Sequence, residues 1–504
     1  MTGLIDNLAL GFAVALSWQN LAWCFAGTLL GTLIGVLPGI GPVATIAILL
    51  PATFALEPTT ALIMLAGIYY GAQYGGSTTA ILINLPGEAS SVVTVLDGHA
   101  MARAGRAGAA LAVAALASLA AGCIATLLIA LAAPLMSGIA LSFGAAEYFS
   151  LMVLGLVAAM VIAAGSLLRA VGMILLGILL GLIGTDVTSG VERYTFGITE
   201  LADGLDFVVL AMGIFGIGEI VASLRNPDRL RPGARITAAV GRLWPSRADF
   251  RAAWAPALRG TFLGSLLGVL PGGGAILASF SAYSLERQMA RDPARFGQGA
   301  VEGVAAPEAA NNAAAQTAFI PLLTLGIPPN AVLALMAGAM MIHGIAPGPN
   351  VLTDQPALVW GLIASMWIGN LMLVVLNLPL IGLWVRLLSV PYRLLAPSIV
   401  VFCAIGVYSL GSSALAVVLM GGFGLAGYVF GRLGCEVTPL LLGFVLGPML
   451  EENLRRAMTL SLGDPTVLVS RPLSAALLAA AAGLLALVLL PNLAARRALL
   501  RDDG

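Results

Sequence analysis

A stretch of fifteen residues occurs twice in this chain and constrains its fold more than any other feature. The first copy runs from Gly27 to Gly41 and the second from Gly260 to Gly274, with 11 of the 15 aligned positions identical and an offset of 233 residues. This offset is far longer than the period of a solenoid repeat. It therefore predicts two copies of one fold unit. Each copy is typical of an apolar helix that stops at Pro-Gly-x-Gly.

The composition indicates that these helices lie in a membrane. Hydrophobic residues make up 60% of the 504 residues, charged residues make up 10%, and the mean hydropathy is +1.00. Soluble domains are about half apolar and about a quarter charged. We therefore expect an all-α polytopic membrane protein with about 11–12 membrane segments, given that each span needs roughly 20 residues. The net charge of zero gives no electrostatic support for nucleic-acid binding.

The chain divides into two predicted halves around a polar linker. Residues 1–224 form the first half, with a hairpin tip at 38–41 and a polar segment at 74–98. Residues 260–504 form the second half, with a tip at 271–274 and a polar segment at 302–330. The Arg-rich linker, 225–259, and the C-terminal tail should both be cytoplasmic, because loops rich in basic residues stay on that side of a membrane.

The arginines also predict the orientation of the two copies. Arg251 and Arg259 precede the second copy, and Arg287 and Arg291 follow it, so both of its ends should be cytoplasmic. The flanks of the first copy, 17–20 and 51–60, carry no arginine. This opposite bias predicts two inverted-topology repeats, each with a re-entrant or broken helical hairpin.

Four stretches are predicted to leave helical geometry within the membrane. They are the two Pro-Gly tips, Gly75 to Gly87, and Ala309 to Pro329. Such backbone is tolerated only where it is buried in protein or lines a water-filled cavity, and matching interruptions in two halves indicate a transporter binding site. The candidate substrate-binding residues are Pro38, Gly39, Gly41, Gly75, Gly76, Ser77, Thr78, Pro271, Gly272, Gly273, Gly274, Asn311, Thr324 and Gly326.

The same stretches offer oxygen ligands for a coupling ion. Thr79, Asn84 and Asn312 are candidate Na⁺ ligands, because neutral oxygens suit a hard cation. Glu308 is either a proton carrier or the cap of a half-helix. Asp97 is either a proton carrier or a turn residue before Gly98. We expect no organic cofactor, with Na⁺ or H⁺ as the coupling ion, and no catalytic residue.

Several long motifs in order resemble the large membrane subunit of tripartite tricarboxylate transporters, the TctA family. They are GVLPGIGP at Gly35 to Pro42, YGGSTTAILINLPG at Tyr74 to Gly87, EGVAAPEAANNAA at Glu302 to Ala314 and IPLLTLGIPP at Ile320 to Pro329. The resemblance implies secondary active uptake of tricarboxylates or related small carboxylates, such as citrate, in the bacterial inner membrane. It also implies two partners, a small membrane subunit and a periplasmic solute-binding protein, and a Na⁺ symport mechanism fits the neutral oxygens above.

Two other functions compete with a carrier. A channel would expose carbonyls around a symmetry axis, whereas an inverted repeat within one chain favours a carrier. A membrane-embedded enzyme would need paired catalytic groups at depth. The chain has two histidines, His99 and His343, and neither lies in the four stretches predicted to be broken.

Overall fold

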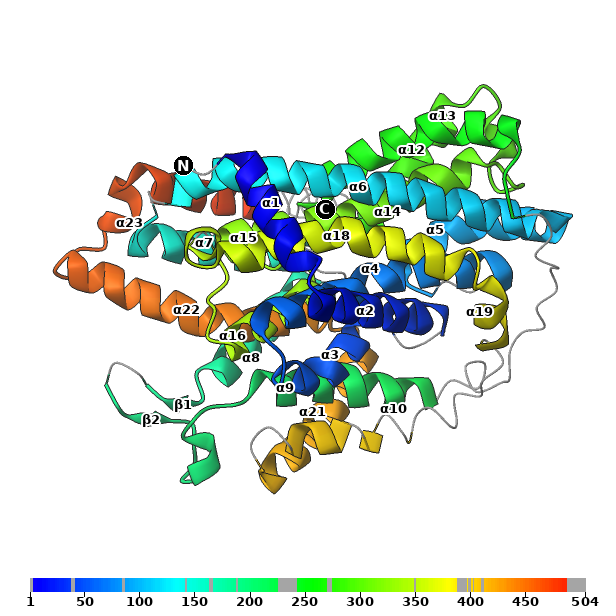
Figure 1. Cartoon of the computed structure of the whole chain (residues 1–504). Helices are drawn as coiled ribbons and strands as arrows, with labels where there is room; N and C mark the ends of the chain where they lie inside the picture. Colours follow the sequence, from blue (N-terminus) through cyan, green and yellow to red (C-terminus); the bar gives the residue numbers. More distant parts are fainter. Residues whose placement is uncertain are drawn as a thin grey trace, which may run out of the picture. The chain divides into compact units, whose positions relative to one another are not determined.

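The computed structural model of this chain is almost entirely helical (Figure 1). It describes residues 3–37, 41–83, 87–140, 143–162, 166–186, 189–224, 243–269, 274–348, 350–387, 397, 400–401, 403–408 and 412–486. The one described sheet has two strands, β1 (Gly184–Thr185) and β2 (Glu192–Arg193), paired antiparallel with Gly184 opposite Arg193. The expectation of an all-α fold is therefore confirmed.

The described helices follow one another closely along the chain. In the first 224 residues they are α1 (Leu4–Ala15), α2 (Trp18–Val36), α3 (Pro42–Thr53), α4 (Pro58–Ile83), α5 (Val92–Thr94), α6 (Ala107–Ala140), α7 (Ala145–Ile162), α8 (Leu167–Gly181), α9 (Phe207–Ala211) and α10 (Gly218–Leu224). Short 3₁₀ or π-helical turns lie between them: η1 (Ala89–Ser91), η2 (Val95–His99), η3 (Ala102–Arg106), η4 (Thr199–Leu201) and η5 (Met212–Ile217).

The remaining helices begin with the second copy of the repeat. They are α12 (Arg247–Gly268), α13 (Gly274–Met289), α14 (Glu302–Thr317), α15 (Phe319–Leu325), α16 (Ala331–Ile342), α17 (Val351–Asp354), α18 (Pro356–Asn377), α19 (Ile381–Leu387), α21 (Ala414–Arg432), α22 (Thr438–Leu460) and α23 (Val467–Ser470), with the turn η6 (Pro293–Arg295). A further apolar helix spans Pro472–Ala486.

Four described helical stretches are long and apolar enough to cross a membrane. They are Trp18–Val36, Ala102–Ala132, Pro356–Asn377 and Ala414–Arg432. Several shorter apolar helices accompany them, including α3, α8 and α16. These helices support a multi-pass membrane protein, and the count of 11–12 segments stays a prediction.

The chain forms two compact units that interleave in the sequence. The first contains Met1–Ser137 and Val208–Tyr428, and the second contains Gly138–Phe207 and Val429–Gly504. The two halves predicted from the sequence, 1–224 and 260–504, instead follow one another along the chain. The predicted linker also ends earlier than expected, because α12 already begins at Arg247, where Ser246 and Asp249 cap it reciprocally. Residues 225–242 of that linker lie outside the described part.

Glycines let α2 and α4 touch backbone to backbone in the first unit. A Cβ atom added to each of three glycines of α2 would lie 2.2–2.4 Å from a carbonyl oxygen of α4; the pairs are Gly27 with Met64, Gly31 with Ile68, and Gly35 with Ala72. Glycines of α4 face back toward α2, since Cβ atoms added to Gly71 and Gly75 would lie 2.8 and 2.4 Å from the carbonyl oxygens of Thr28 and Thr32. Small residues at such spacing are the usual means of close helix association in membranes.

The second copy of the repeat makes the same contact with another helix. Three glycines of α12 lie one helical turn apart, and their added Cβ atoms would lie 2.2–2.5 Å from carbonyl oxygens of α14; the pairs are Gly260 with Ala306, Gly264 with Ala310, and Gly268 with Ala314. In Figure 1, α12 and α14 run together, as do α2 and α4. Each copy therefore packs on the helix that contains a predicted polar segment.

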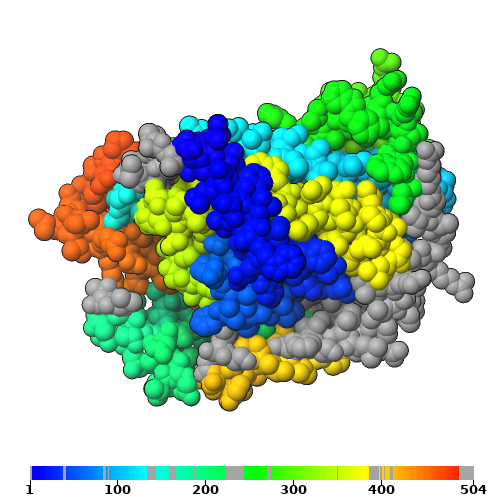
Figure 2. Space-filling model, in the orientation of Figure 1, coloured from blue at the N-terminus to red at the C-terminus, as the bar shows by residue number. Residues whose placement is uncertain are grey.

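The N-terminal helix lies on the surface of the first unit. Figure 2 shows α1, in dark blue, lying across α18, in yellow. Gly11 allows this contact, because an added Cβ would lie 2.3 Å from the carbonyl oxygen of Trp360. Phe12 stacks on Trp367 with ring centroids 5.8 Å apart. This packing secures the first residues of the chain to a helix that is long and apolar enough to span a membrane.

Two stretches predicted to leave helical geometry are largely helical. Helix α4 continues through Gly75 and Thr79 to Ile83, and α14 continues from Glu302 through Asn312 to Thr317. The interpretation of polarity as a helix break was wrong there, because the hydroxyls bond back to carbonyls of their own helix. The Thr78 hydroxyl donates to the carbonyl of Tyr74 at 3.4 Å, and the Thr317 hydroxyl donates to the carbonyl of Ala313 at 3.0 Å. A turn at Ala318 separates α14 from α15, and the chain leaves helical geometry after Leu325, at Gly326, and returns to it at Ala331.

Candidate functional site

A narrow cavity in the first unit brings together polar side chains from four segments. Its lining residues are Tyr74, Ser77 and Thr78 from α4, Leu111, Ala114, Ala115 and Ser118 from α6, Glu308 from α14, and Asn377 and Leu378 from the end of α18. The cavity has room for about one water molecule in this conformation. Both polar segments that the sequence singled out, 74–98 and 302–330, contribute to it.

Glu308 is the acidic group of this cavity and is almost fully buried, with 1% of its surface exposed. The Ser77 hydroxyl donates to its Oε2 at 2.5 Å, and the Thr94 hydroxyl donates to its Oε1. None of the described residues that line the cavity is an arginine. Because an isolated carboxylate is costly to bury, a group in this setting binds a proton or a cation. Glu308 therefore has the surroundings of an ion-coupling residue, whereas its place seven residues into α14 does not suit a cap.

Asn312 lies one turn after Glu308 and presents a free oxygen. Its Nδ2 donates to the Ser118 hydroxyl at 2.7 Å and to the backbone carbonyl of Glu308 at 3.0 Å. Its Oδ1 is buried and has no hydrogen-bond partner among the described residues. Buried polar atoms without partners are few in native proteins, and an ion or a water is a common reason for one. The set of side chains around the cavity is thus rich in oxygen atoms, as a hard cation requires.

Asn377 and Asn311 are also buried amides with unpaired atoms. The Oδ1 of Asn377 faces no partner among the described residues, while its Nδ2 donates to Thr32 and to the carbonyl of Leu373. Neither side-chain polar atom of Asn311 has a described partner. Four residues at this site were not predicted from the sequence: Asn377, Ser118, Thr94 and Tyr74. The one signal for Asn377 was a lone amide near the end of an apolar segment.

The other predicted site residues that are described have mainly structural contacts. The Thr79 hydroxyl donates to the carbonyl of Val36 at 2.9 Å, so it faces α2 rather than the cavity. Gly75 packs against α2, and Gly76 lies near Gly87 and Glu88. The Thr324 hydroxyl donates to Ile320, and Gly326 ends α15 with a positive φ of 72°.

The two Pro-Gly tips fall mostly outside the described residues. Pro38, Gly39, Pro271, Gly272 and Gly273 are in this group, as is the Na⁺ candidate Asn84. Gly41 is described as the residue before α3, and Gly274 is the first residue of α13. Both copies of the repeat therefore resume a helix directly after the tip. Their roles in binding stay predictions.

Asp97 joins the first polar segment to the loop before α14. It is fully buried, and its Oδ1 accepts backbone N–H groups of Gly297, Gly299 and Ala300 at 2.9, 2.8 and 2.7 Å. The Tyr283 hydroxyl donates to its Oδ2 at 2.9 Å. A carboxylate that accepts this many hydrogen bonds ties the two segments together as a structural clasp. This geometry favours a structural role over that of a proton carrier.

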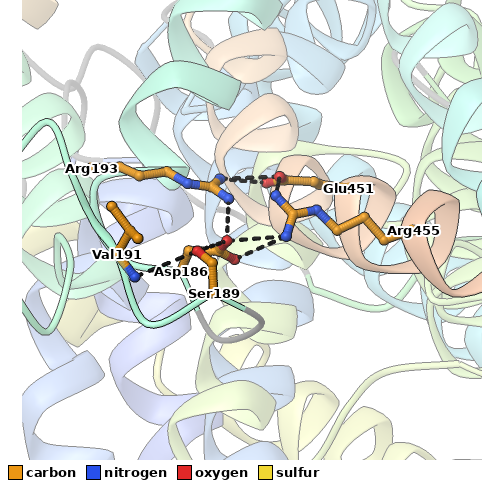
Figure 3. A network of polar contacts seen from close by, with 6 residues as sticks. All are labelled: Asp186, Ser189, Val191, Arg193, Glu451 and Arg455. Carbon is orange, nitrogen blue, oxygen red and sulfur yellow. Dashed lines mark hydrogen bonds and ion pairs between the residues drawn. The ribbon is translucent and has the colours of Figure 1, made fainter.

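A charged network in the second unit holds the β1–β2 hairpin to α22 (Figure 3). Arg193 pairs with Asp186 at 2.7 Å and with Glu451 at 2.9 Å. Arg455 pairs with the same two acids, at 3.0 and 2.6 Å. Ser189 donates a further hydrogen bond to Asp186 at 2.5 Å. Because two acids face two arginines, the network balances its own charge and gives Arg193 a structural role.

Comparison with known proteins gives one family and two similar proteins. The model of the "Tripartite tricarboxylate transporter TctA family" matches residues 21–442. An uncharacterized 52.8 kDa protein in the TAR-I ttuC' 3'region of Agrobacterium vitis is 59% identical over 497 residues, which cover 99% of this chain and 98% of that protein. An uncharacterized protein in the TAR-II ttuC' 3'region of the same organism is 61% identical over 234 residues, which cover 46% of this chain and 97% of that protein. No solved structure matches the chain.

Proposed function

Because the chain belongs to the tripartite tricarboxylate transporter TctA family, we propose that it imports a small carboxylate by cation symport. Membership of this family makes the protein the large membrane subunit of such a transporter rather than an enzyme. The proposal adds the substrate class, tricarboxylates such as citrate or related small carboxylates, and Na⁺ as the coupling ion. It also adds dependence on a periplasmic solute-binding protein and a small membrane subunit in the bacterial inner membrane.

The buried carboxylate of Glu308 is the observation that carries this proposal. It has two hydroxyl donors, no cationic side chain among the residues that line its cavity, and a buried amide oxygen, from Asn312, one helical turn away. A Na⁺ ion held by these oxygens would neutralise the carboxylate. It would also attract a substrate with several negative charges, which an uncompensated Glu308 would repel.

The helix starts that follow the two Pro-Gly tips are suited to bind the anionic substrate. Helices α3 and α13 each begin directly after a Pro-Gly tip, and a helix start presents free N–H groups and a positive dipole end. In inverted-repeat transporters such half-helix starts face the anionic group of the substrate. We therefore propose that the tips bind the carboxylates. The narrow cavity would have to widen for this, as alternating access requires.

Replacing Asn312 with alanine should raise the Na⁺ concentration for half-maximal uptake by about tenfold, because the ion loses one oxygen ligand. The measurement is uptake of radiolabelled citrate and of a panel of di- and tricarboxylates by membrane vesicles that contain all three proteins. The apparent affinity for the binding protein should change less than the Na⁺ requirement does.

Asn453→Ala is the matched control for this variant. Asn453 also donates its Nδ2 to the carbonyl four residues earlier, at 2.8 Å, but it lies in α22 of the other unit. It should leave the Na⁺ requirement unchanged. An unchanged Na⁺ requirement in Asn312→Ala would remove Asn312 from the ion site. Uptake that ignores Na⁺ and follows the pH gradient would replace Na⁺ with H⁺ as the coupling ion.

The inverted topology predicts that the flanks of the two copies face opposite sides of the membrane. Ala55 follows the first copy and Ala294 follows the second, and both are exposed. With the four native cysteines replaced, a membrane-impermeant maleimide should label Ala55→Cys in intact cells. It should label Ala294→Cys only after the membrane is made permeable. Labelling of both from one side would contradict the inverted arrangement and leave the transporter assignment in place.

A further inference from the structure

A continuous apolar groove runs between α6 and α12 in the first unit. Its deeper part has a volume of ≈ 620 Å³, counting the space open to the surroundings, and is lined largely by small and apolar residues: Val113, Leu116, Ala117, Ala120, Pro245, Phe250, Ala253, Trp254, Ala257, Leu258 and Thr261. A shallower part shares Leu116, Pro245, Phe250 and Trp254 with it and extends to Trp244, Ser246, Arg247 and Arg251. In Figure 2 the two helices, in cyan and green, meet along the upper edge.

The shallow end of the groove is both basic and aromatic. Arg247 and Arg251 are four residues apart on α12, so they share one face of the helix. Neither forms an ion pair with a described residue, and the acid between them, Asp249, already pairs with Arg106 at 2.5 Å. Trp244 and Trp254 beside them are 66% and 55% exposed. These are large apolar side chains to leave without a partner next to two free positive charges.

We propose that this groove binds an acidic phospholipid, with its phosphate on Arg247 and Arg251 and an acyl chain along α6 and α12. The groove offers a basic region for the phosphate and, next to it, an apolar region for the acyl chain. The guanidiniums lie at the first turns of α12, where the helix dipole also favours an anion. The apolar lining then continues for ten residues, from Arg251 to Thr261, or about 15 Å along the helix axis.

A phospholipid accounts for more of the groove than an apolar helix of a partner subunit would. The apolar face of a helix could fill the deep part, but it would leave both guanidiniums without a counter-charge. Tryptophan side chains are also enriched at the depth of lipid headgroups. The Arg-rich stretch that contains the shallow end is the part of the sequence predicted to be cytoplasmic, so the lipid would belong to that leaflet.

The position of the groove links lipid binding to the proposed ion site. Its α12 wall continues into the glycines that contact α14, and α14 contains Glu308. A bound lipid would hold α12 against α6 and so support this pair of helices. This consequence rests on the proposed function, whereas lipid binding itself does not.

Native mass spectrometry of the purified chain, with palmitoyl-oleoyl phosphatidylglycerol or phosphatidylcholine added, tests the site. The wild type should retain phosphatidylglycerol in preference to phosphatidylcholine. The double variant Arg247→Gln/Arg251→Gln should bind phosphatidylglycerol about 20-fold more weakly, since each basic residue near an anionic lipid contributes roughly fivefold. Arg287→Gln/Arg291→Gln removes the same charge from exposed positions of the same predicted side and should change binding less than twofold.

A second variant tests the acyl-chain part of the groove. Ala120 lines the deep part and is exposed, so Ala120→Trp fills the groove without disturbing the core. It should lower retention of phosphatidylglycerol at least about fivefold, because the indole occupies the space of the acyl chain. Equal retention of both lipids by the wild type, or unchanged retention in both variants, would overturn the proposal. So would a photo-crosslink from position 120 to a small membrane subunit in place of lipid. Lipid retention can be measured whether or not the protein transports a carboxylate, so failure of this proposal can be told apart from failure of the proposed function.

Discussion

Glu308→Ala is expected to lower carboxylate uptake by at least about 100-fold while the protein stays folded in the membrane. Glu308 is the acidic residue of the cavity, and Ser77 and Thr94 donate to it from segments more than 200 positions away in the sequence. Loss of the charge partner of a buried ion costs about 3–5 kcal/mol, which corresponds to a factor of roughly 10²–10⁴ in ion affinity. Uptake of labelled carboxylates by vesicles under an imposed Na⁺ gradient measures the effect, and the amount of folded protein in the membrane is measured in parallel.

Two further variants show how Glu308 acts. Glu452→Ala is the control, because that side chain is 64% exposed and pairs with Arg456, far along the chain from the cavity. It should transport normally. Glu308→Gln keeps a side-chain oxygen and the shape of the cavity, so some Na⁺-driven uptake should remain at higher Na⁺ concentration. Wild-type uptake by Glu308→Ala would remove this residue from the mechanism. If Glu308→Gln lost all uptake and the wild type took up substrate in response to a pH gradient alone, Glu308 would be assigned to proton coupling.

Gly31→Ala and Gly264→Ala are each expected to destabilise the folded protein by about 3 kcal/mol or more. The added Cβ atoms would lie 2.4 Å from the carbonyl oxygen of Ile68 and 2.2 Å from that of Ala310. Both obstacles are helix backbone, which cannot turn aside as a flexible side chain would, so the helices must move apart and lose packing. The midpoint of thermal unfolding in detergent and the yield of folded protein measure the loss.

The two variants should behave alike, because each removes the central glycine of one copy of the repeat. Gly172→Ala on α8 is the control, since an added Cβ there meets nothing within 4 Å. That change should be neutral or slightly stabilising, because alanine favours a helix by up to about 1 kcal/mol over glycine. A large loss for one copy and none for the other would show that the two contacts are not equivalent. Unfolding midpoints for Gly31→Ala and Gly264→Ala equal to that of Gly172→Ala would refute the packing argument.

The duplicated glycines explain why the repeat could be recognised from the sequence. Gly27, Gly31 and Gly35 recur as Gly260, Gly264 and Gly268, and both sets contact the backbone of another helix. A requirement for no side chain at a helix contact leaves a direct mark in the sequence, at intervals of four residues. The same holds for the membrane class, which follows from the composition. Glu308 and Ser77 could also be picked out, because polar groups are rare and costly in segments this apolar.

The tertiary structure alone decided which polar residues meet at the cavity. Asn312 bonds Ser118 across 194 positions of the chain, and Asn377 joins the same cavity from the end of α18. Pairings of this kind leave no local pattern, because they depend on how whole helices pack. The structure also decided that α4 and α14 stay helical through their polar residues. Threonine hydroxyls donate to carbonyls of their own helix, and helical geometry pairs most backbone groups within the segment, where lipid offers no partner.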